Sequence, residues 1–515
     1  MSKILDRAVD AGSATIKPAL LAYSLGYLST AGPAAVKILV AIALKKRNFS
    51  EALDKFYSIF RQAASINRFP AFCGTIVAGS LFLQLPLQNV LQQVASHSKR
   101  PIRTSIIKRA ARVFSSFLAA WLSFVLINTS RGLPATESNV NNRRDVSVAS
   151  EFATPIHKHG NSTESIEHYS TPPNDDTISS EQLQRRPQLA GKSIDLTIFA
   201  AVRALDIIIG SIWHSKKRKC NASSSGGSIT DLIGTYTDPA IFATSCSIIM
   251  WSWFYSPERL PRSYNLWISS AAQVDERLIE ALRQVRYGNF VYGKDTGIER
   301  LLGSMCEDYN WPIEWGDPAK TIPIPCEMVH MGSGPSCEKH AAARFARAWL
   351  FAARMYFPLN LLMAARRRRI TKQQALRTLL DAGRSSAFLS AFIALFYYGV
   401  CLARTRLGPR VFSRKSVTPM QWDGGLCVGA GCLLCGWSVL FEKPPRRQEL
   451  ALFVAPRAAA TVLPRRYGKK HQWKEHLIFA LSTATVLTAV QENPDRVRGV
   501  FGRLLHQVLS SSNTR

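Results

Sequence analysis

The stretch PCEMVHMGSGPSCEKHAAARFARAWLFAARMYFPLNLLMAARRRR, residues 325–369, joins a group of cysteines and histidines to an apolar segment that ends in four arginines. The apolar segment, 346–365, has the length of a membrane-spanning helix, which needs about 20 residues. The arginines at 366–369 can hold the end of such a helix at the lipid headgroups. The stretch therefore predicts a membrane helix that directly follows a small Cys/His-rich loop.

Apolar runs of this kind recur along the chain and alternate with polar, basic linkers. Of the 515 residues, 47% are hydrophobic and only 19% are charged, and this alternation is typical of proteins that cross a membrane several times. The runs lie at 18–44, 69–94, 110–127, 195–213, 238–255, 346–365, 386–403, 424–441, 449–463 and 475–490. The sequence therefore predicts an all-α fold, a multi-pass transmembrane helical bundle, with the lipid bilayer as its partner.

The formal net charge of +30 does not by itself indicate nucleic-acid binding. The basic residues stand in short clusters at the ends of apolar runs, as at 45–47 and 216–219, where they can contact lipid headgroups. No RNA- or DNA-binding motif occurs, so we expect no nucleic-acid partner. Binding to other membrane proteins, or self-association, is compatible with this pattern. Because the clusters flank the runs on both sides, they do not predict an orientation in the membrane.

Short matching segments occur in the same order in two parts of the chain. Residues 196–204 (LTIFAAVRA) match 450–458 (LALFVAPRA), and 241–245 (IFATS) match 478–482 (IFALS). Such self-similarity is typical of an internal duplication. We therefore predict two homologous halves with about four to five spans each.

The duplication and a change in composition predict the domain organisation. We expect a first membrane half at 1–256, a connector at 257–345 that carries the Cys/His-rich segment, and a second membrane half at 346–515. Within the first half, about 131–192 is polar with few large apolar residues, which predicts a disordered loop.

Cys326, His330, Cys337 and His340 fall within fifteen residues, as C-x3-H-x6-C-x2-H. Cysteine and histidine are the residues that bind zinc, yet this spacing is not a standard zinc-finger pattern. The alternatives are a disulfide between Cys326 and Cys337, or a packed turn with free thiols. A structural loop or disulfide is the preferred interpretation, zinc is the second, and no other cofactor is indicated.

The sequence contains no other constellation that indicates catalysis. Walker A, dinucleotide-binding, HExxH and GxSxG motifs are all missing, so we expect no enzymatic activity. The cysteines inside apolar runs are interpreted as small apolar residues; they are Cys246, Cys401, Cys427, Cys432 and Cys435.

Charged residues inside the apolar runs support an alternative function. Arg203 and Asp206 are three apart, so on a helix they could pair on one face, and Arg457 is the equivalent of Arg203 in the second half. Intramembrane charges often mark functional sites. If these residues faced each other between the halves, they could line a translocation or transport pathway for a solute or lipid.

Glycines in the run at 424–441 predict close helix packing. Gly425 and Gly429 are four residues apart, and Gly436 follows Cys432 at the same spacing. Small residues one turn apart let helix backbones approach each other.

The opening stretch resembles the Cys-rich region of the transmembrane protein 135 family, particularly its fungal branch. The resemblance covers roughly 260–410 and rests on Cys326, His330, Pro335, Ser336, Cys337, Tyr356, Pro358 and Leu359. That family is similar to the Tim17/Tim22/Tim23 and peroxisomal membrane protein group. The resemblance implies a non-enzymatic protein of a mitochondrial or peroxisomal membrane that acts in organelle organisation and lipid handling. In animal members the motif lies near the N-terminus, whereas here it begins the second half, so their topology does not transfer.

Overall fold

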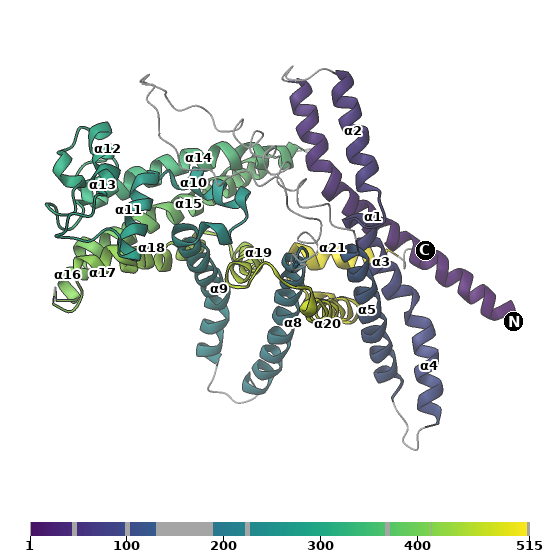
Figure 1. Ribbon diagram of the computed structural model, residues 1–515. Helices are drawn as coiled ribbons and strands as arrows, with labels where there is room; N and C mark the ends of the chain where they lie inside the picture. Colours follow the sequence, from purple (N-terminus) through teal and green to yellow (C-terminus); the bar gives the residue numbers. More distant parts are fainter. Residues whose placement is uncertain are drawn as a thin grey trace. The chain divides into compact units, whose positions relative to one another are not determined.

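The computed structural model describes residues 2–43, 49–97, 103–129, 189–221, 227–365, 371–413 and 415–511 (Figure 1). In these ranges nearly all regular structure is helical, and the two strands described, β1 (Leu189–Ala190) and β2 (Tyr467–Gly468), form one short antiparallel pair. The predicted all-α fold is thus confirmed. The basic clusters at 45–47 and 366–369 and most of the predicted disordered loop lie outside the described residues.

Seven helical segments of the described part are long and apolar enough to cross a membrane, which confirms the multi-pass character. They are Thr15–Ile42, Phe69–Ser96, Thr104–Asn128, Ile194–Ser215, Cys337–Ala365, Lys372–Val411 and Pro419–Phe441. The predicted runs at 238–255, 449–463 and 475–490 form helices that are not among the seven. These helices are α9 (Gly227–Tyr255), α19 (Pro444–Val462) and α20 (Gln472–Glu492). Each carries charged residues, such as Asp238, Arg457 and Glu475, that lower its mean hydropathy.

The chain forms two compact units, and each combines residues that are far apart in sequence. Unit 1 contains residues 1–194, 465–488 and 508–515, and unit 2 contains 195–464 and 489–507. These units do not coincide with the segments 1–256, 257–345 and 346–515, which rest on the sequence repeat and remain a prediction.

Unit 1 is a bundle of helices that includes most of α20. Its other helices are α1 (Ser2–Ala43), α2 (Phe49–Ala63), α3 (Phe69–Phe82), α4 (Gln84–Ser96) and α5 (Thr104–Asn128). The buried ring of Phe479 on α20 stacks on Phe124 at a centroid distance of 4.3 Å and contacts Phe72 at 5.8 Å. Three aromatic side chains therefore join α3, α5 and α20.

Unit 2 is built around two long helices, α14 (Cys337–Ala365) and α15 (Lys372–Cys401), which run side by side (Figure 1). Thr371 caps α15, since its side chain accepts a hydrogen bond from the backbone N–H of Gln374. A π-helical turn, Leu402–Arg406, follows α15 and leads to α16 (Gly408–Val411), α17 (Pro419–Gln421) and α18 (Cys427–Cys435). Helix α9 packs against both α18 and α19.

The connector forms short helices that pack into the core of unit 2. They are α10 (Arg262–Ala272), α11 (Glu276–Tyr287), α12 (Glu299–Tyr309) and α13 (Cys326–His330). Asp275 caps α11 by accepting a hydrogen bond from the backbone N–H of Arg277. Leu302, Met305 and Met328 of this segment are completely buried, so the connector is part of the folded unit. The remaining α-helices in the described ranges are α8 (Ile194–Asn221) and α21 (Gly499–Ser510).

Candidate functional site

A tight reversal of the chain brings the Cys/His-rich segment together. Helix α13 begins at Cys326 and ends at His330. Met331, Gly332 and Gly334 then take positive φ angles of 47°, 79° and 82°, a left-handed conformation that glycine adopts without a steric penalty. The reversal returns the chain to Cys337, the first residue of α14.

Four side chains converge at the end of this reversal: Cys326, His330, Cys337 and Cys401. Their ligand atoms all lie within 4.8 Å of one another. The Sγ atoms of Cys326 and Cys337 are 3.9 Å apart, and Nε2 of His330 is 3.5 Å from Sγ of Cys401. We call these four residues the Cys/His cluster.

Hydrogen bonding orients the ring of His330. Its Nδ1 lies 2.7 Å from the carbonyl oxygen of Gly334, so the Nδ1–H donates to that oxygen and Nε2 faces Cys401. The side chain is completely buried. The lone pair of Nε2 is therefore directed into the Cys/His cluster.

The structure brings together three of the four residues in the predicted ligand set. His340 lies outside the Cys/His cluster: its ring stacks on His330 at 4.6 Å and meets Tyr397 edge-on at 5.2 Å. Among the described residues neither ring nitrogen of His340 has a hydrogen-bond partner. Cys401, interpreted from the sequence as a small apolar residue, takes its place. It is 71 residues from His330, so no local spacing could have identified it.

The preferred interpretation was a structural loop or a disulfide, and of these the disulfide between Cys326 and Cys337 is not formed. Bonded sulfur atoms lie about 2.05 Å apart, whereas these two are 3.9 Å apart, and both residues are free cysteines. Hydrogen bonding from Cys401, with contributions from His330 and the positive charge of Arg404, lowers the pKa of the Cys326 thiol below its ordinary value despite burial. The Cys/His cluster therefore favours a thiolate at Cys326.

A buried ion pair that the sequence analysis missed lies next to the Cys/His cluster. Arg404 and Asp423 are 4% and 0% exposed, and Nε of the arginine is 2.5 Å from Oδ1 of the aspartate. The hydroxyl of Tyr292 donates to the other carboxylate oxygen at 2.5 Å. Asp423 directly precedes the apolar run at 424–441, so its charge at the edge of that run was the available signal.

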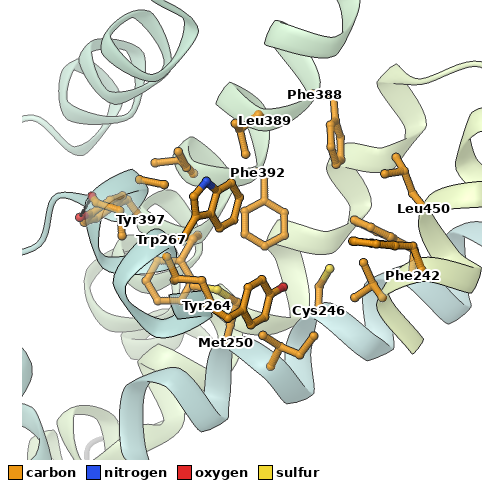
Figure 2. Close-up of a pocket in the computed structure, with 18 of the residues that line it drawn as sticks. Phe242, Cys246, Met250, Tyr264, Trp267, Phe388, Leu389, Phe392, Tyr397 and Leu450 are labelled. Atoms are coloured by element: carbon orange, nitrogen blue, oxygen red, sulfur yellow. Dashed lines mark hydrogen bonds between the residues drawn. The ribbon is translucent and has the colours of Figure 1, made fainter. Parts of the chain in front are cut away.

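Unit 2 also contains an apolar pocket of about 340 Å³. Helices α9, α10, α14, α15 and α19 contribute its walls, and Figure 2 shows the rings of Trp267 and Phe392 facing the same space. Its lining comprises Phe242, Cys246, Ile249, Met250, Tyr264, Trp267, Ile268, Ala271, Ala272, Tyr356, Phe388, Leu389, Phe392, Ile393, Phe396, Tyr397, Leu450, Phe453 and Val454. Trp267 and Phe453 are 42% and 55% exposed, so they mark where the pocket meets the surface.

Of the family-motif residues, Tyr356 lines this pocket, and Pro358 lies within α14 two residues further on. Tyr397 also lines it, and the same ring contacts His340, which in turn stacks on His330. A continuous series of ring contacts thus connects the pocket with the Cys/His cluster.

The charges predicted inside spans do not pair as expected. Asp206 forms its ion pair with Arg498, which also contacts Asp238 at 3.4 Å, and not with Arg203. Arg203 is buried between the rings of Phe199 and Phe501.

Arg457 does not join this charged group. Its guanidinium lies over the ring of Phe453, 3.7 Å from the centroid, and donates to the carbonyl oxygen of the same residue. Each predicted charge therefore has a local partner within unit 2.

The predicted packing glycines take three different environments. A Cβ on Gly436 would lie 2.4 Å from Cα of Ala243, so the backbones of α9 and the segment after α18 are in close contact. Gly425, with φ of 146°, sits at a break in the helix. A Cβ on Gly429 would make only an ordinary contact with Trp251 at 3.6 Å.

A second close approach was not predicted from the sequence. A Cβ on Gly399 of α15 would lie 2.8 Å from Cα of Gly431 on α18. These two glycines are in different runs, so their spacing carried no signal.

Comparisons with known proteins found no match: no family model, no curated protein and no solved structure matches the chain.

Proposed function

We propose that this chain is a non-enzymatic, multi-pass protein of a mitochondrial or peroxisomal membrane that acts in organelle organisation and lipid handling. The seven apolar helices support residence in a membrane. The organelle and the role follow from the resemblance of residues 260–410 to the transmembrane protein 135 family. The apolar pocket of unit 2 is the observation that carries the lipid-handling part.

The chemistry of the pocket favours an apolar ligand. Nearly all its lining side chains are aliphatic or aromatic, and a polar ligand would lose its hydrogen bonds to water there without replacement. An acyl chain gains about 0.8 kcal/mol for each methylene that it buries.

The size of the pocket limits what it can hold. A cavity of about 150 Å³ accommodates one benzene molecule, and ligand pockets begin at about 300 Å³. The volume of about 340 Å³ therefore suits one acyl chain or a similar apolar group rather than a whole phospholipid.

The pocket also has a position that suits a membrane ligand. Its walls include Tyr356 of α14 and Phe392 of α15, two helices that can cross a membrane. Trp267 is part of the short helix α10 and is partly exposed at the edge of the pocket. A lipid tail could enter beside this partly exposed ring.

Photolabelling of the purified full-length chain in detergent tests this site. A fatty acid with a photoactivatable diazirine should crosslink to peptides of α10 and α15, and unlabelled fatty acid should compete. Ala271→Phe fills part of the pocket and should weaken binding on the order of tenfold, because losing two buried methylenes costs about 1.6 kcal/mol. Ser270→Phe adds the same group to an exposed neighbour on α10 and should bind like the wild type.

Equal labelling of wild type and Ala271→Phe would exclude the pocket as the lipid site. The organelle is tested separately by fractionation of cells that express the tagged chain. Extraction from the mitochondrial or peroxisomal membrane only by detergent is expected. Enrichment in neither organelle would contradict the proposed localisation but not lipid binding.

A further inference from the structure

We propose that Cys326, His330, Cys337 and Cys401 bind one zinc ion in a closed, structural site. The proposal rests on the geometry of the Cys/His cluster and does not depend on lipid binding. It replaces His340 of the sequence-predicted ligand set with Cys401.

The spacing of the ligand atoms fits tetrahedral coordination. With Zn–S bonds of about 2.3 Å and Zn–N bonds of about 2.05 Å, neighbouring sulfurs lie about 3.8 Å apart and a sulfur and a nitrogen about 3.6 Å apart. The structure has 3.9 Å between Cys326 and Cys337 and 3.5 Å between Cys401 and His330. All remaining separations are within 4.8 Å, so small side-chain rotations would complete the tetrahedron.

The surroundings of the ligands are those of a metal site. A zinc-binding histidine usually donates its second ring N–H to a carbonyl or carboxylate, and Nδ1 of His330 does so to Gly334 at 2.7 Å. The hydroxyl of Thr405 donates to the carbonyl oxygen of Cys401 at 2.8 Å. These contacts hold the ligands in place from outside the Cys/His cluster.

A positively charged side chain, already paired with Asp423, also acts on the site. Three thiolates and a neutral imidazole around Zn²⁺ leave one net negative charge. The guanidinium of Arg404, which belongs to the turn directly after Cys401, lowers the energy of negative charge at Cys326. A disulfide would use only two of the four groups and leave the orientation of His330 and the position of Cys401 unexplained.

A zinc ion with four ligands from the protein would have a structural role. Catalytic zinc keeps one position for water or substrate, whereas four protein ligands leave none. Cys326 and His330 belong to α13, Cys337 begins α14, and Cys401 ends α15. The ion would thus fasten the connector to one end of the α14–α15 pair.

Metal analysis of the full-length chain, purified in detergent without chelators, tests the proposal. We expect about one zinc per chain. Cys326→Ser, Cys337→Ser and Cys401→Ser should each reduce this to near zero. Cys306→Ala removes a buried thiol elsewhere in unit 2 and should retain the metal, as should His340→Phe, which distinguishes the site from the sequence-predicted set.

Cobalt substitution makes the test independent of how well the variants fold. Stripped wild-type protein titrated with Co²⁺ should develop thiolate-to-cobalt charge-transfer absorption and tetrahedral d–d bands at one equivalent. A Cys326–Cys337 disulfide in the purified chain, cobalt spectra without thiolate bands, or zinc that persists in Cys401→Ser would each overturn the proposal.

Discussion

The pair Arg404 and Asp423 shows how much depends on single residues in unit 2. Both are almost completely buried, and Arg404 also donates to the carbonyl oxygen of Ile324 while Tyr292 donates to Asp423. A buried charge that loses its partner costs several kcal/mol because neither water nor a counter-charge compensates it. The pair therefore fixes the segment after α15 against the connector and α18.

Asp423→Leu should destabilise the protein strongly, since it leaves the Arg404 guanidinium buried without its counter-charge. We expect a loss of about 3–5 kcal/mol in the free energy of unfolding, measured as a lower thermal midpoint of the detergent-purified chain. The exposed pair Lys443 and Asp381, at 2.5 Å, is the control: Asp381→Leu should cost less than about 1 kcal/mol. Replacing both partners, Asp423→Leu with Arg404→Met, should recover much of the loss. A midpoint unchanged in the single variant would show that Arg404 reaches another anion or water.

At the scale of single residues, the sequence predicts those members of the site that are close together along the chain. Cys326, His330 and Cys337 were found because the outer two are only eleven positions apart and because the residue types are those of a metal site. His340 was included for the same reason, but its position on α14 turns it to the ring of His330 instead. Cys401 required knowledge of how α14 and α15 pack.

The close packing of α9 against α18 and the segment after it depends on Gly436, which has no side chain. A Cβ added to Gly436 would lie only 2.4 Å from Cα of Ala243. Close by, the hydroxyl of Ser247 donates to the carbonyl oxygen of Cys432 at 2.8 Å. Without a strong hydrophobic force between helices in lipid, such close backbone contact is a main source of helix association.

Gly436→Ala should push the two elements apart because Ala243 presents backbone rather than a flexible side chain. We expect a loss of about 1–3 kcal/mol in stability, measured by thermal unfolding in detergent. Gly429→Ala lies on the same stretch, where the nearest atom to the added methyl is 3.6 Å away. It should be neutral or slightly stabilising, because alanine favours helix over glycine. Equal midpoints for the two variants would mean that α9 is not held by this crossing.

Hydropathy predicted the elements better than their arrangement. Each of the seven candidate spans overlaps a predicted run, although several are longer, because length and apolarity are local properties. Helices α9, α19 and α20 also form where runs were predicted, but their charges are matched by tertiary contacts such as that of Asp238 with Arg498. The choice of packing partners depends on close backbone contacts such as that of Gly399 with Gly431. The periodicity of the sequence does not predict such contacts between helices.

Across the whole molecule, each compact unit combines early and late parts of the chain. The predicted repeat would account for this. It equates Phe242 of α9 with Phe479 of α20. Phe242 contacts Phe388 within unit 2, and Phe479 contacts Phe72 and Phe124 within unit 1. If the halves are copies, each contributes part of its chain to the bundle formed mainly by the other, and the boundaries of a duplication cannot then be those of the folded units.

This exchange predicts that the stability of unit 1 depends on Phe479, which follows most residues of unit 1 by more than 300 positions in the sequence. Phe479 is 2% exposed, and Phe479→Ala would leave a cavity between α3 and α5, at a cost of about 3–5 kcal/mol. The readout is the rate at which a thiol reagent modifies Cys73, a half-buried residue of α3, followed by mass spectrometry of its peptide. That rate should rise in Phe479→Ala. Ile478→Ala changes the exposed neighbour and should leave it unchanged. If Cys73 reacts equally in both variants, α20 does not close unit 1, and the bundle of α1 to α5 is stable without the late part of the chain.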